Sequence, residues 1–198
     1  MIRDCTAIIL AGGASTRMGR DKANVLLGGQ TLLQHVIAST QQVFPQTILS
    51  VREPRPGIGL PQVCDASDVS GPLAGVIAAM TQVKTPWVFI VACDMPFMQA
   101  AVIELLGQYR DGNQAVVPVI RGHAQPMAAF YAHGVLEVLR AHLARGGKNS
   151  LRAVFERLCM RYVDETELIK ADPALRSFFD LDTPHDVAAA MQQQTQLK

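Results

Sequence analysis

The chain has 198 residues, of which 49% are hydrophobic and 18% are charged. These values exclude a disordered protein, whose composition combines few apolar side chains with a large net charge. The 18 lysines and arginines nearly balance the 17 aspartates and glutamates, giving a formal net charge of +1. The protein therefore has no overall field that attracts nucleic acid or an anionic membrane, and residues 1–198 are expected to form a single domain.

The cysteines and the apolar runs indicate the compartment. The four cysteines are scattered without a Cys-x-x-Cys pair, as expected for buried, reduced thiols, and the five histidines lack zinc-like spacing. The longest candidate for a membrane span runs from Trp87 to Cys93, far below the ~20 residues that a span requires. We therefore expect a soluble, cytoplasmic protein.

Short apolar runs alternate with amphipathic segments along the first half of the chain. In chain order, the pattern predicts a strand, a helix, two strands, a helix, a strand and a helix, at residues 6–10, 31–43, 47–51, around 63, 72–83, 87–92 and 99–109. The run at 87–92 is apolar throughout, as is typical of a central parallel strand that is covered on both faces.

The second half continues with shorter strands and ends in a helix. Strands are expected at residues 115–119, 127–131, 161–163 and 178–181, and helices at 134–143, 150–158 and 184–192. Strands separated by helices of about 10–15 residues indicate right-handed βαβ crossovers. The expected fold is therefore α/β, with a mostly parallel central sheet and helices on both faces, and ligands should bind beyond the carboxyl ends of the strands.

The loop after the first predicted strand is rich in glycine and carries basic side chains. Residues 10–22 read LAGGASTRMGRDK. Glycines let backbone N–H groups approach phosphate oxygens closely, while Arg17 adds a bidentate fork and Lys22 a point charge. The spacing fits neither a Walker loop nor a dinucleotide-binding fingerprint. The residues nonetheless predict a loop that binds a polyphosphate.

This loop closely resembles the signature loop of the molybdenum cofactor guanylyltransferases, within the wider nucleotidyltransferase family. Three further stretches resemble that family in the same order along the chain: Gly71–Gly75, Cys93–Pro96 and Asp182–Pro184. The resemblance implies a Rossmann-like nucleotidyltransferase fold and the transfer of GMP from GTP to molybdopterin, with release of pyrophosphate. GTP and the molybdopterin cofactor are thus the expected substrates. A monomer is expected, with a molybdoenzyme or its chaperone as a partner.

The resemblance also implies which residues catalyse the reaction and bind the nucleotide. Arg17, Lys22 and Asp94 are the expected catalytic residues, and the expected nucleotide-binding residues are Leu10, Ala11, Gly12, Gly13, Lys22, Asp65 and Asp94. As a lone aspartate in a loop, Asp65 could equally be a solvated turn residue. Asp94 follows the apolar strand at the predicted carboxyl edge, where a carboxylate suits Mg²⁺, the expected cofactor.

A second metal-binding carboxylate is expected from Asp182 or Asp180. These residues flank Leu181, so on the predicted strand they would project to the same side. Asp182 could alternatively cap the helix that starts near Pro184.

The same aspartates leave two possibilities for the base of the nucleotide, guanine and cytosine. Guanylyltransferases usually carry asparagines where this chain has Asp180 and Asp182, and the sequence there looks more like that of the related cytidylyltransferases, which use CTP. The pair Gly12 and Gly13 favours GTP, because a side chain at position 12 is expected to crowd the space beside the nucleotide. A non-catalytic nucleotide-binding delivery protein is the remaining alternative.

Overall fold

The computed structural model describes residues 1–13, 18–19, 21–64 and 71–196. The strands are β1 (Cys5–Leu10), β2 (Leu26–Leu27), β3 (Gln30–Thr31), β4 (Gln46–Val51), β5 (Gln62–Cys64), β6 (Trp87–Ala92), β7 (Ala115–Ile120), β8 (His123–Ala124), β9 (Ala128–Ala132) and β10 (Met160–Val163). The α-helices are α1 (Leu32–Val43), α2 (Pro72–Gln82), α3 (Ala100–Gly107), α4 (Val135–Ala144), α5 (Glu165–Leu168) and α6 (Pro184–Gln196). Short 3₁₀ helices are η1 (Lys22–Asn24), η2 (Leu151–Arg157) and η3 (Arg176–Phe178).

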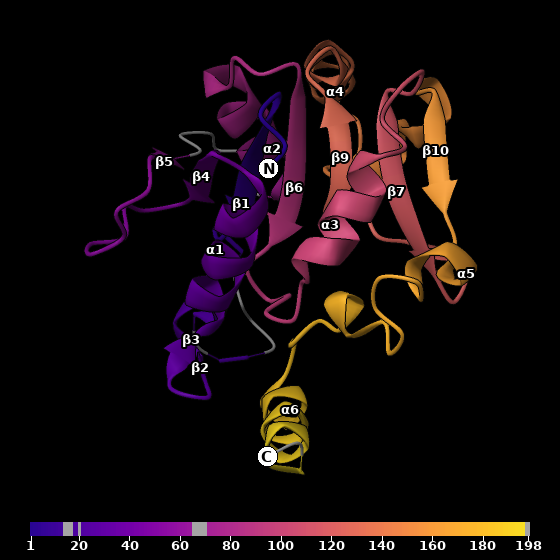
Figure 1. The fold of residues 1–198 in the computed structure, drawn as a ribbon. Helices are drawn as coiled ribbons and strands as arrows, with labels where there is room; N and C mark the ends of the chain where they lie inside the picture. The colour runs from indigo at the N-terminus through magenta and orange to yellow at the C-terminus, as the bar shows by residue number, and fades with distance from the viewer. Residues whose placement is uncertain (14–17, 20, 65–70, 197–198) are drawn as a thin grey trace.

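The main sheet has the strand order β10-β7-β9-β6-β1-β4-β5, and β8 pairs with β7 (Figure 1). β1 lies in the middle, parallel to both β4 and β6, with Ile8 opposite Ile48 and Ile90. β9 runs antiparallel to its two neighbours, β6 and β7, and β8 runs antiparallel to β7. The prediction of an α/β fold with a mostly parallel sheet is confirmed.

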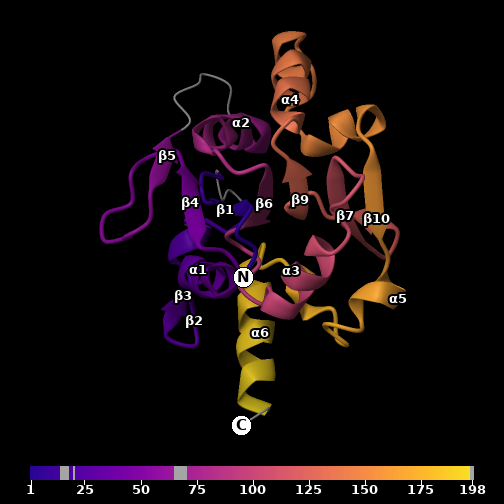
Figure 2. The ribbon, with the colours of Figure 1, turned by 45° about the horizontal axis from the view of Figure 1, so that its top comes forward.

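Helices cover both faces of the sheet, as predicted. Figure 2 shows α1 and α3 on one face and α2 and α4 on the other. Alternate residues of β1 point to opposite faces, so Ile9 belongs to the core under α1 and α3, whereas Ile8 belongs to the core under α2 and α4. Each face of the sheet therefore contributes its own hydrophobic core.

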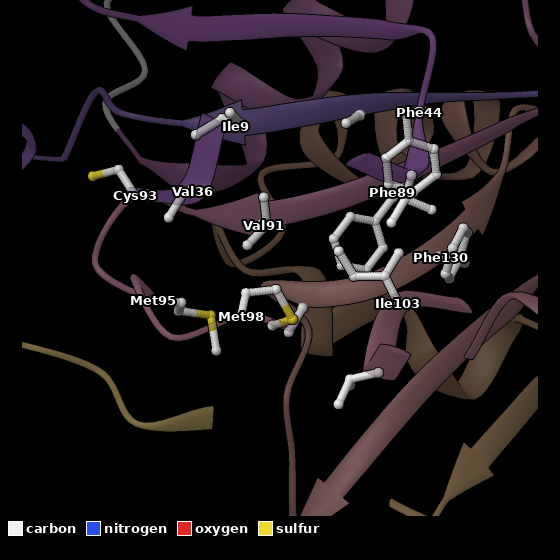
Figure 3. Close-up of a cluster of buried hydrophobic side chains, with 14 of the residues drawn as sticks. Ile9, Val36, Phe44, Phe89, Val91, Cys93, Met95, Met98, Ile103 and Phe130 are labelled. Carbon is white, nitrogen blue, oxygen red and sulfur yellow. The ribbon is translucent and has the colours of Figure 1, made fainter. Parts of the chain in front are cut away.

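The core under α1 and α3 is built around three phenylalanine rings (Figure 3). The centroid of Phe89 lies 5.5 Å from that of Phe44 and 4.9 Å from that of Phe130. The same core continues to Met95 and Met98, in the loop that follows β6. This loop is thereby anchored to the interior directly beyond the carboxyl end of the strand.

The C-terminal helix α6 extends beyond the carboxyl edge of the sheet, next to the small β2–β3 hairpin (Figure 1). A separate small core joins the two, with Leu27 and Leu32 on one side and Leu181, Val187 and Ala190 on the other. No helix in the described part of the chain is long and apolar enough to cross a membrane.

Three local predictions were wrong or incomplete. The helix expected at residues 150–158 is a 3₁₀ helix at Leu151–Arg157; the spacing of Leu151, Val154 and Phe155 fits one buried face of either kind of helix, so the sequence did not indicate which kind forms. Residues 178–181 form no strand: Phe178 and Leu181 pack into different cores, and their burial does not come from strand pairing. The β2–β3 hairpin was missed although Gly28 and Gly29, both with positive φ, are a known signal for such a turn.

The expectation of buried cysteines holds for only half of them. Cys5 and Cys93 are buried, whereas Cys64 and Cys159 are exposed. All four are free thiols. Cys64 ends the edge strand β5 and Cys159 precedes the other edge strand, β10, so both lie where the sheet has no further strand to cover them.

Candidate active site

The glycine-rich loop and the loop that carries Asp94 begin side by side at the carboxyl edge of the sheet. The amide of Cys93 donates to the carbonyl oxygen of Leu10 at 3.0 Å, and the amide of Ala11 donates to the carbonyl oxygen of Ser50 at 2.8 Å. Cys93 and Met95 are both buried, so the backbone on either side of Asp94 is fixed by packing. Asp94 is therefore held at the end of β6, where the α/β fold predicts a ligand.

Lys22 connects the two loops through its ammonium group. Its Nζ donates to Asp94 Oδ2 at 2.8 Å and also to Asp182 Oδ1. The lysine side chain is only 13% exposed. Burial lowers the pKa of Lys22, but the hydrogen bonds that it donates to Asp182 and Asp94, and the negative charges of these aspartates, outweigh that effect and raise the pKa above its usual value. Lys22 is therefore a charged, partly buried group, and it is not a surface lysine.

Asp182 reaches this cluster because the chain before α6 is attached to the Asp94 loop. The amide of Leu181 donates to the carbonyl oxygen of Asp94 at 2.9 Å, and the Leu181 side chain is fully buried. The cap of α6 is made by the next residues: Thr183 Oγ1 accepts from the amide of Asp186, and Asp186 Oδ2 accepts from the amide of Thr183 at 2.8 Å. The alternative that Asp182 caps this helix is wrong, and its carboxylate faces Lys22 instead.

Asp180 adds a third carboxyl group to the same region. The surrounding protein desolvates this carboxyl, and the negative charges of Asp94 and Asp182 act in the same direction, so that its pKa rises to about 7. Among the described residues, Asp94, Asp180 and Asp182 thus lie near the ammonium group of Lys22. Carboxylate oxygens are the ligands that Mg²⁺ prefers.

The donor set fits Mg²⁺ that is shared with a substrate. Asp94 and Asp182 offer the hard oxygen ligands that Mg²⁺ prefers, and this ion usually takes one or two carboxylates together with phosphate oxygens. Among the described residues, no group of three or more His, Cys, Asp or Glu side chains could hold a metal ion by itself. Asp94 and Asp182, which Lys22 bridges, could therefore supply part of a coordination shell that phosphate oxygens of a substrate would complete.

The beginning of the glycine-rich loop is tightly packed at Gly12 and open at Gly13. A Cβ atom at position 12 would lie 3.3 Å from the backbone nitrogen of Arg52, whereas one at position 13 would meet no described atom within 4 Å. A side chain at position 12 would therefore press against the chain after β4, a contact that the sequence did not predict. That it also crowds the nucleotide stays a prediction.

A cavity of about 540 Å³ borders this loop. Gly12, Gly13, Asp21 and the segment 52–56 line it, together with the start of α1, but Asp94 and Asp182 do not. The cavity therefore reaches the glycine-rich loop without including the carboxylate cluster.

The turn before α2 depends on a residue that sequence reasoning missed, Asn149. Its Oδ1 accepts from the amide of Leu73 at 3.0 Å, near the start of α2. Gly71 has φ of 143°, and a Cβ there would lie 2.4 Å from Asn149 Nδ2. Glycine is therefore needed at position 71 both for its backbone angle and for the approach of Asn149. The only signal for Asn149 is tertiary, because it lies far from Gly71 along the chain.

The expected site residues are thus partly brought together. Lys22, Asp94 and Asp182 meet, whereas Leu10 ends β1 and Ala11, Gly12 and Gly13 follow it at the same edge of the sheet. Arg17 and Asp65 lie outside the described residues.

Solved structures share this architecture. A molybdopterin-guanine dinucleotide biosynthesis protein A from Archaeoglobus fulgidus matches with a TM-score of 0.84 and 26% identity, over 96% of this chain and 99% of that one. The 2-C-methyl-D-erythritol 4-phosphate cytidylyltransferase from Thermus thermophilus shares the fold, with a TM-score of 0.69 and 18% identity over 96% and 98% of the two chains. Fold and site together define the protein as a nucleotidyltransferase.

Sequence comparison narrows this class to one family. The family model of the MobA-like NTP transferase domain matches residues 7–163, and the chain belongs to this family. A molybdenum cofactor guanylyltransferase from Desulfosudis oleivorans is 33% identical over 93% of both chains. A probable molybdenum cofactor guanylyltransferase from Pelotomaculum thermopropionicum is 32% identical over 93% of this chain and 91% of its own.

Proposed function

We propose that this nucleotidyltransferase acts in molybdenum cofactor biosynthesis and transfers GMP from GTP to molybdopterin. A terminal phosphate oxygen of molybdopterin attacks the α-phosphorus of GTP, the bond from that phosphorus to the β-phosphate oxygen breaks, and pyrophosphate leaves. The names of the relatives support the substrates. The observation that carries the proposal is the position of Lys22 between Asp94 and Asp182, directly beside the glycine-rich loop.

The expected site residues have distinct tasks in the proposed reaction. Lys22 and Arg17 bind the triphosphate and stabilise negative charge on the departing pyrophosphate. Asp94, with Asp182 beside it, holds Mg²⁺. The bound ion would neutralise charge on the phosphate oxygens. The protein mainly aligns two anionic substrates and offsets their repulsion, which is how phosphoryl-transfer enzymes generally act.

The ion pairs suggest the order in which these groups are used. Among the described residues, the ammonium group of Lys22 faces the carboxylates of Asp94 and Asp182. A divalent cation bound by these two carboxylates would take over their neutralisation. Lys22 would then bind the phosphates of the nucleotide.

Use of CTP is the second candidate, and one feature of the chain favours it. Asp180 and Asp182 stand where the guanylyltransferases usually carry asparagines. Asp182 accepts a hydrogen bond from Lys22, and the positive charge of Lys22 acts on Asp180, so both aspartates lie near the cluster. A cytidylyltransferase for the same cofactor would use the same phosphate chemistry with a different base.

The deciding experiment supplies molybdopterin, Mg²⁺ and each of the four nucleoside triphosphates in turn, and measures release of pyrophosphate. Turnover with GTP above the other three supports the proposal, and preference for CTP replaces it with the second candidate. Release in the absence of molybdopterin would indicate simple hydrolysis. Binding of a nucleotide without turnover in any mixture would indicate a non-catalytic delivery protein.

A further inference from the structure

Arg55 lies in the loop between β4 and β5 and connects residues on both sides of the glycine-rich loop. Its Nη1 donates to Asp21 Oδ2 at 2.6 Å, and its Nη2 donates to the carbonyl oxygen of Ala11 at 2.8 Å. Ala11 directly follows β1, and Asp21 directly precedes Lys22. One guanidinium group thus holds together the two ends of the segment that is expected to bind phosphates.

Arg55 is itself fixed from the sheet. The amide side chain of Gln62, on β5, accepts from the backbone nitrogen of Arg55 at 2.7 Å and donates to its carbonyl oxygen at 2.8 Å. The Arg55 side chain is only 18% exposed. Both backbone polar groups of Arg55 are therefore hydrogen-bonded, and its guanidinium group has little freedom to move.

The contact with Asp21 leads to the reactive cluster. Asp21 Oδ1 accepts from the amide of Ala23 at 3.1 Å and so begins the 3₁₀ turn η1, to which Lys22 belongs. Lys22 in turn reaches Asp94. Displacement of the Asp21 carboxylate would therefore rotate this turn and move the ammonium group of Lys22.

Stability alone does not explain an arginine here. Within the part of the chain that the structure describes, the buried Nε of Arg55 has no hydrogen-bond partner. A buried donor without a partner costs stability, so an apolar side chain would be tolerated better if the loop only needed filling. A planar fork is needed, however, to reach two acceptors at once, and lysine offers only a single point charge.

We propose that Arg55 is a positioning residue for triphosphate binding, which orients Lys22 through Asp21 and the start of the glycine-rich loop through Ala11. Arg55 lines the cavity beside the glycine-rich loop, and its role in this proposal is exerted through Asp21 and Ala11, to which it stays bound. The inference rests on the proposed function, because it assumes that Lys22 and this loop bind the phosphates of a nucleotide.

The chain provides a matched control in Arg110. Its side chain is 15% exposed, its Nη1 donates to Asp4 Oδ2 at 2.9 Å and its Nε donates to the carbonyl oxygen of Gly107 at 2.9 Å. This arginine thus makes the same kinds of contact as Arg55. Asp4 precedes β1, so the pair lies at the amino edge of the sheet, opposite to the candidate active site.

The experiment compares Arg55→Met, Arg55→Lys and Arg110→Met at a temperature at which all variants are folded. Calorimetry gives the Kd of the Mg²⁺ complex of the nucleoside triphosphate that the wild type binds best, and melting curves give Tm. We expect Arg55→Met to raise Kd about tenfold, since it removes two charge-assisted hydrogen bonds. The Kd of Arg55→Lys should lie between those of Arg55→Met and the wild type. Arg110→Met should lower Tm but leave Kd unchanged.

A double-mutant cycle with Asp21→Asn tests whether Arg55 acts on Lys22 through Asp21. The losses in affinity from Arg55→Met and Asp21→Asn should not add, because both break the same pair. Additive losses, or an affinity of Arg55→Met equal to that of Arg110→Met, would overturn the inference. Failure of the proposed function is a separate result, in which the wild type binds a nucleoside triphosphate without transferring its nucleoside monophosphate to molybdopterin. The comparison of Kd values would still decide the role of Arg55. A wild type that binds none of the four triphosphates would overturn both.

Discussion

Individual charged side chains, far apart along the chain, define the candidate active site. Lys22, Asp94 and Asp182 come from three segments, and hydrogen bonds of Lys22 to both aspartates join them. Lys22 is held before any substrate arrives, and its position depends on the two carboxylates that are expected to bind the metal. In the proposed function, metal binding and phosphate binding would therefore be coupled in this cluster.

Asp94→Asn tests the expected metal ligand. The substitution keeps the size of the side chain but removes its charge, so the fold should persist while the rate falls by ~10²–10³, as for the loss of one key electrostatic group. The measurement is pyrophosphate release at saturating Mg²⁺, with circular dichroism as the check on folding. Turnover near that of the wild type would show that Asp94 is not needed to hold the metal.

Lys22→Met separates the lysine's role in phosphate binding from its effect on the metal. The change removes the cation that competes for Asp94 and Asp182, so the nucleotide-free protein should bind Mg²⁺ more tightly than the wild type. Affinity for the triphosphate should fall, because one of its cationic partners is lost. Titration with Mn²⁺ as a spectroscopic substitute for Mg²⁺ measures the first effect, and calorimetry with GTP the second. Weaker metal binding would mean that the metal does not use these two carboxylates.

At the scale of elements, α6 has an unexpected part in the site. Thr183 and Asp186 form reciprocal side-chain contacts at its first turn, and Asp182 is the residue just before them. The start of this helix therefore determines where Asp182 lies relative to Lys22. The helix was predicted from its apolar pattern, but its link to the Asp94 loop through Leu181 was not.

Thr183→Ala should loosen this helix start. Loss of a threonine cap costs ~1 kcal/mol of stability, which corresponds to a fall in Tm of ~2–4 °C for a protein of this size. Transfer activity should fall as well, because Asp182 loses its fixed position. Gln192→Ala, on the exposed side of the same helix, is the control and should change neither quantity. A normal Tm for Thr183→Ala would show that the cap contributes little.

The whole molecule is stabilised mainly by the two cores on either side of the sheet. Phe89, fully buried between Phe44 and Phe130, is at the centre of one of them and lies on β6, the strand that ends at Asp94. The strand thus connects the stability of the core with the placement of the site.

Phe89→Ala should destabilise the protein by ~3–5 kcal/mol, the usual cost when a buried phenylalanine is replaced by alanine. Chemical denaturation measures this difference. Because the candidate active site lies beyond the end of β6 and not at Phe89, the protein that remains folded at low temperature should still transfer the nucleotide. A loss below ~1 kcal/mol would mean that the neighbouring rings close the cavity.

Much of the fold and part of the site could be predicted from the sequence alone. Apolar periodicity located the central strands and the helices around them, because burial on one or both faces leaves a pattern in neighbouring residues. The glycine-rich loop and Asp94 were singled out by their residue types, by their place directly after predicted strands and by the resemblance to a known family, all of which depend on short, continuous stretches. These features depend on local sequence and could be read without coordinates.

Tertiary structure decided the remaining features. Three contacts of the site join residues that are distant along the chain. These are the hydrogen bond of Lys22 to Asp182, the contact of Asn149 with the turn at Gly71, and the hydrogen bond of Arg55 to Asp21. An arginine in a proline-containing loop has no local pattern that distinguishes it from a solvated side chain. The partners of such charged groups are determined by which segments the sheet brings to its carboxyl edge, and strand order is a property of the folded chain as a whole.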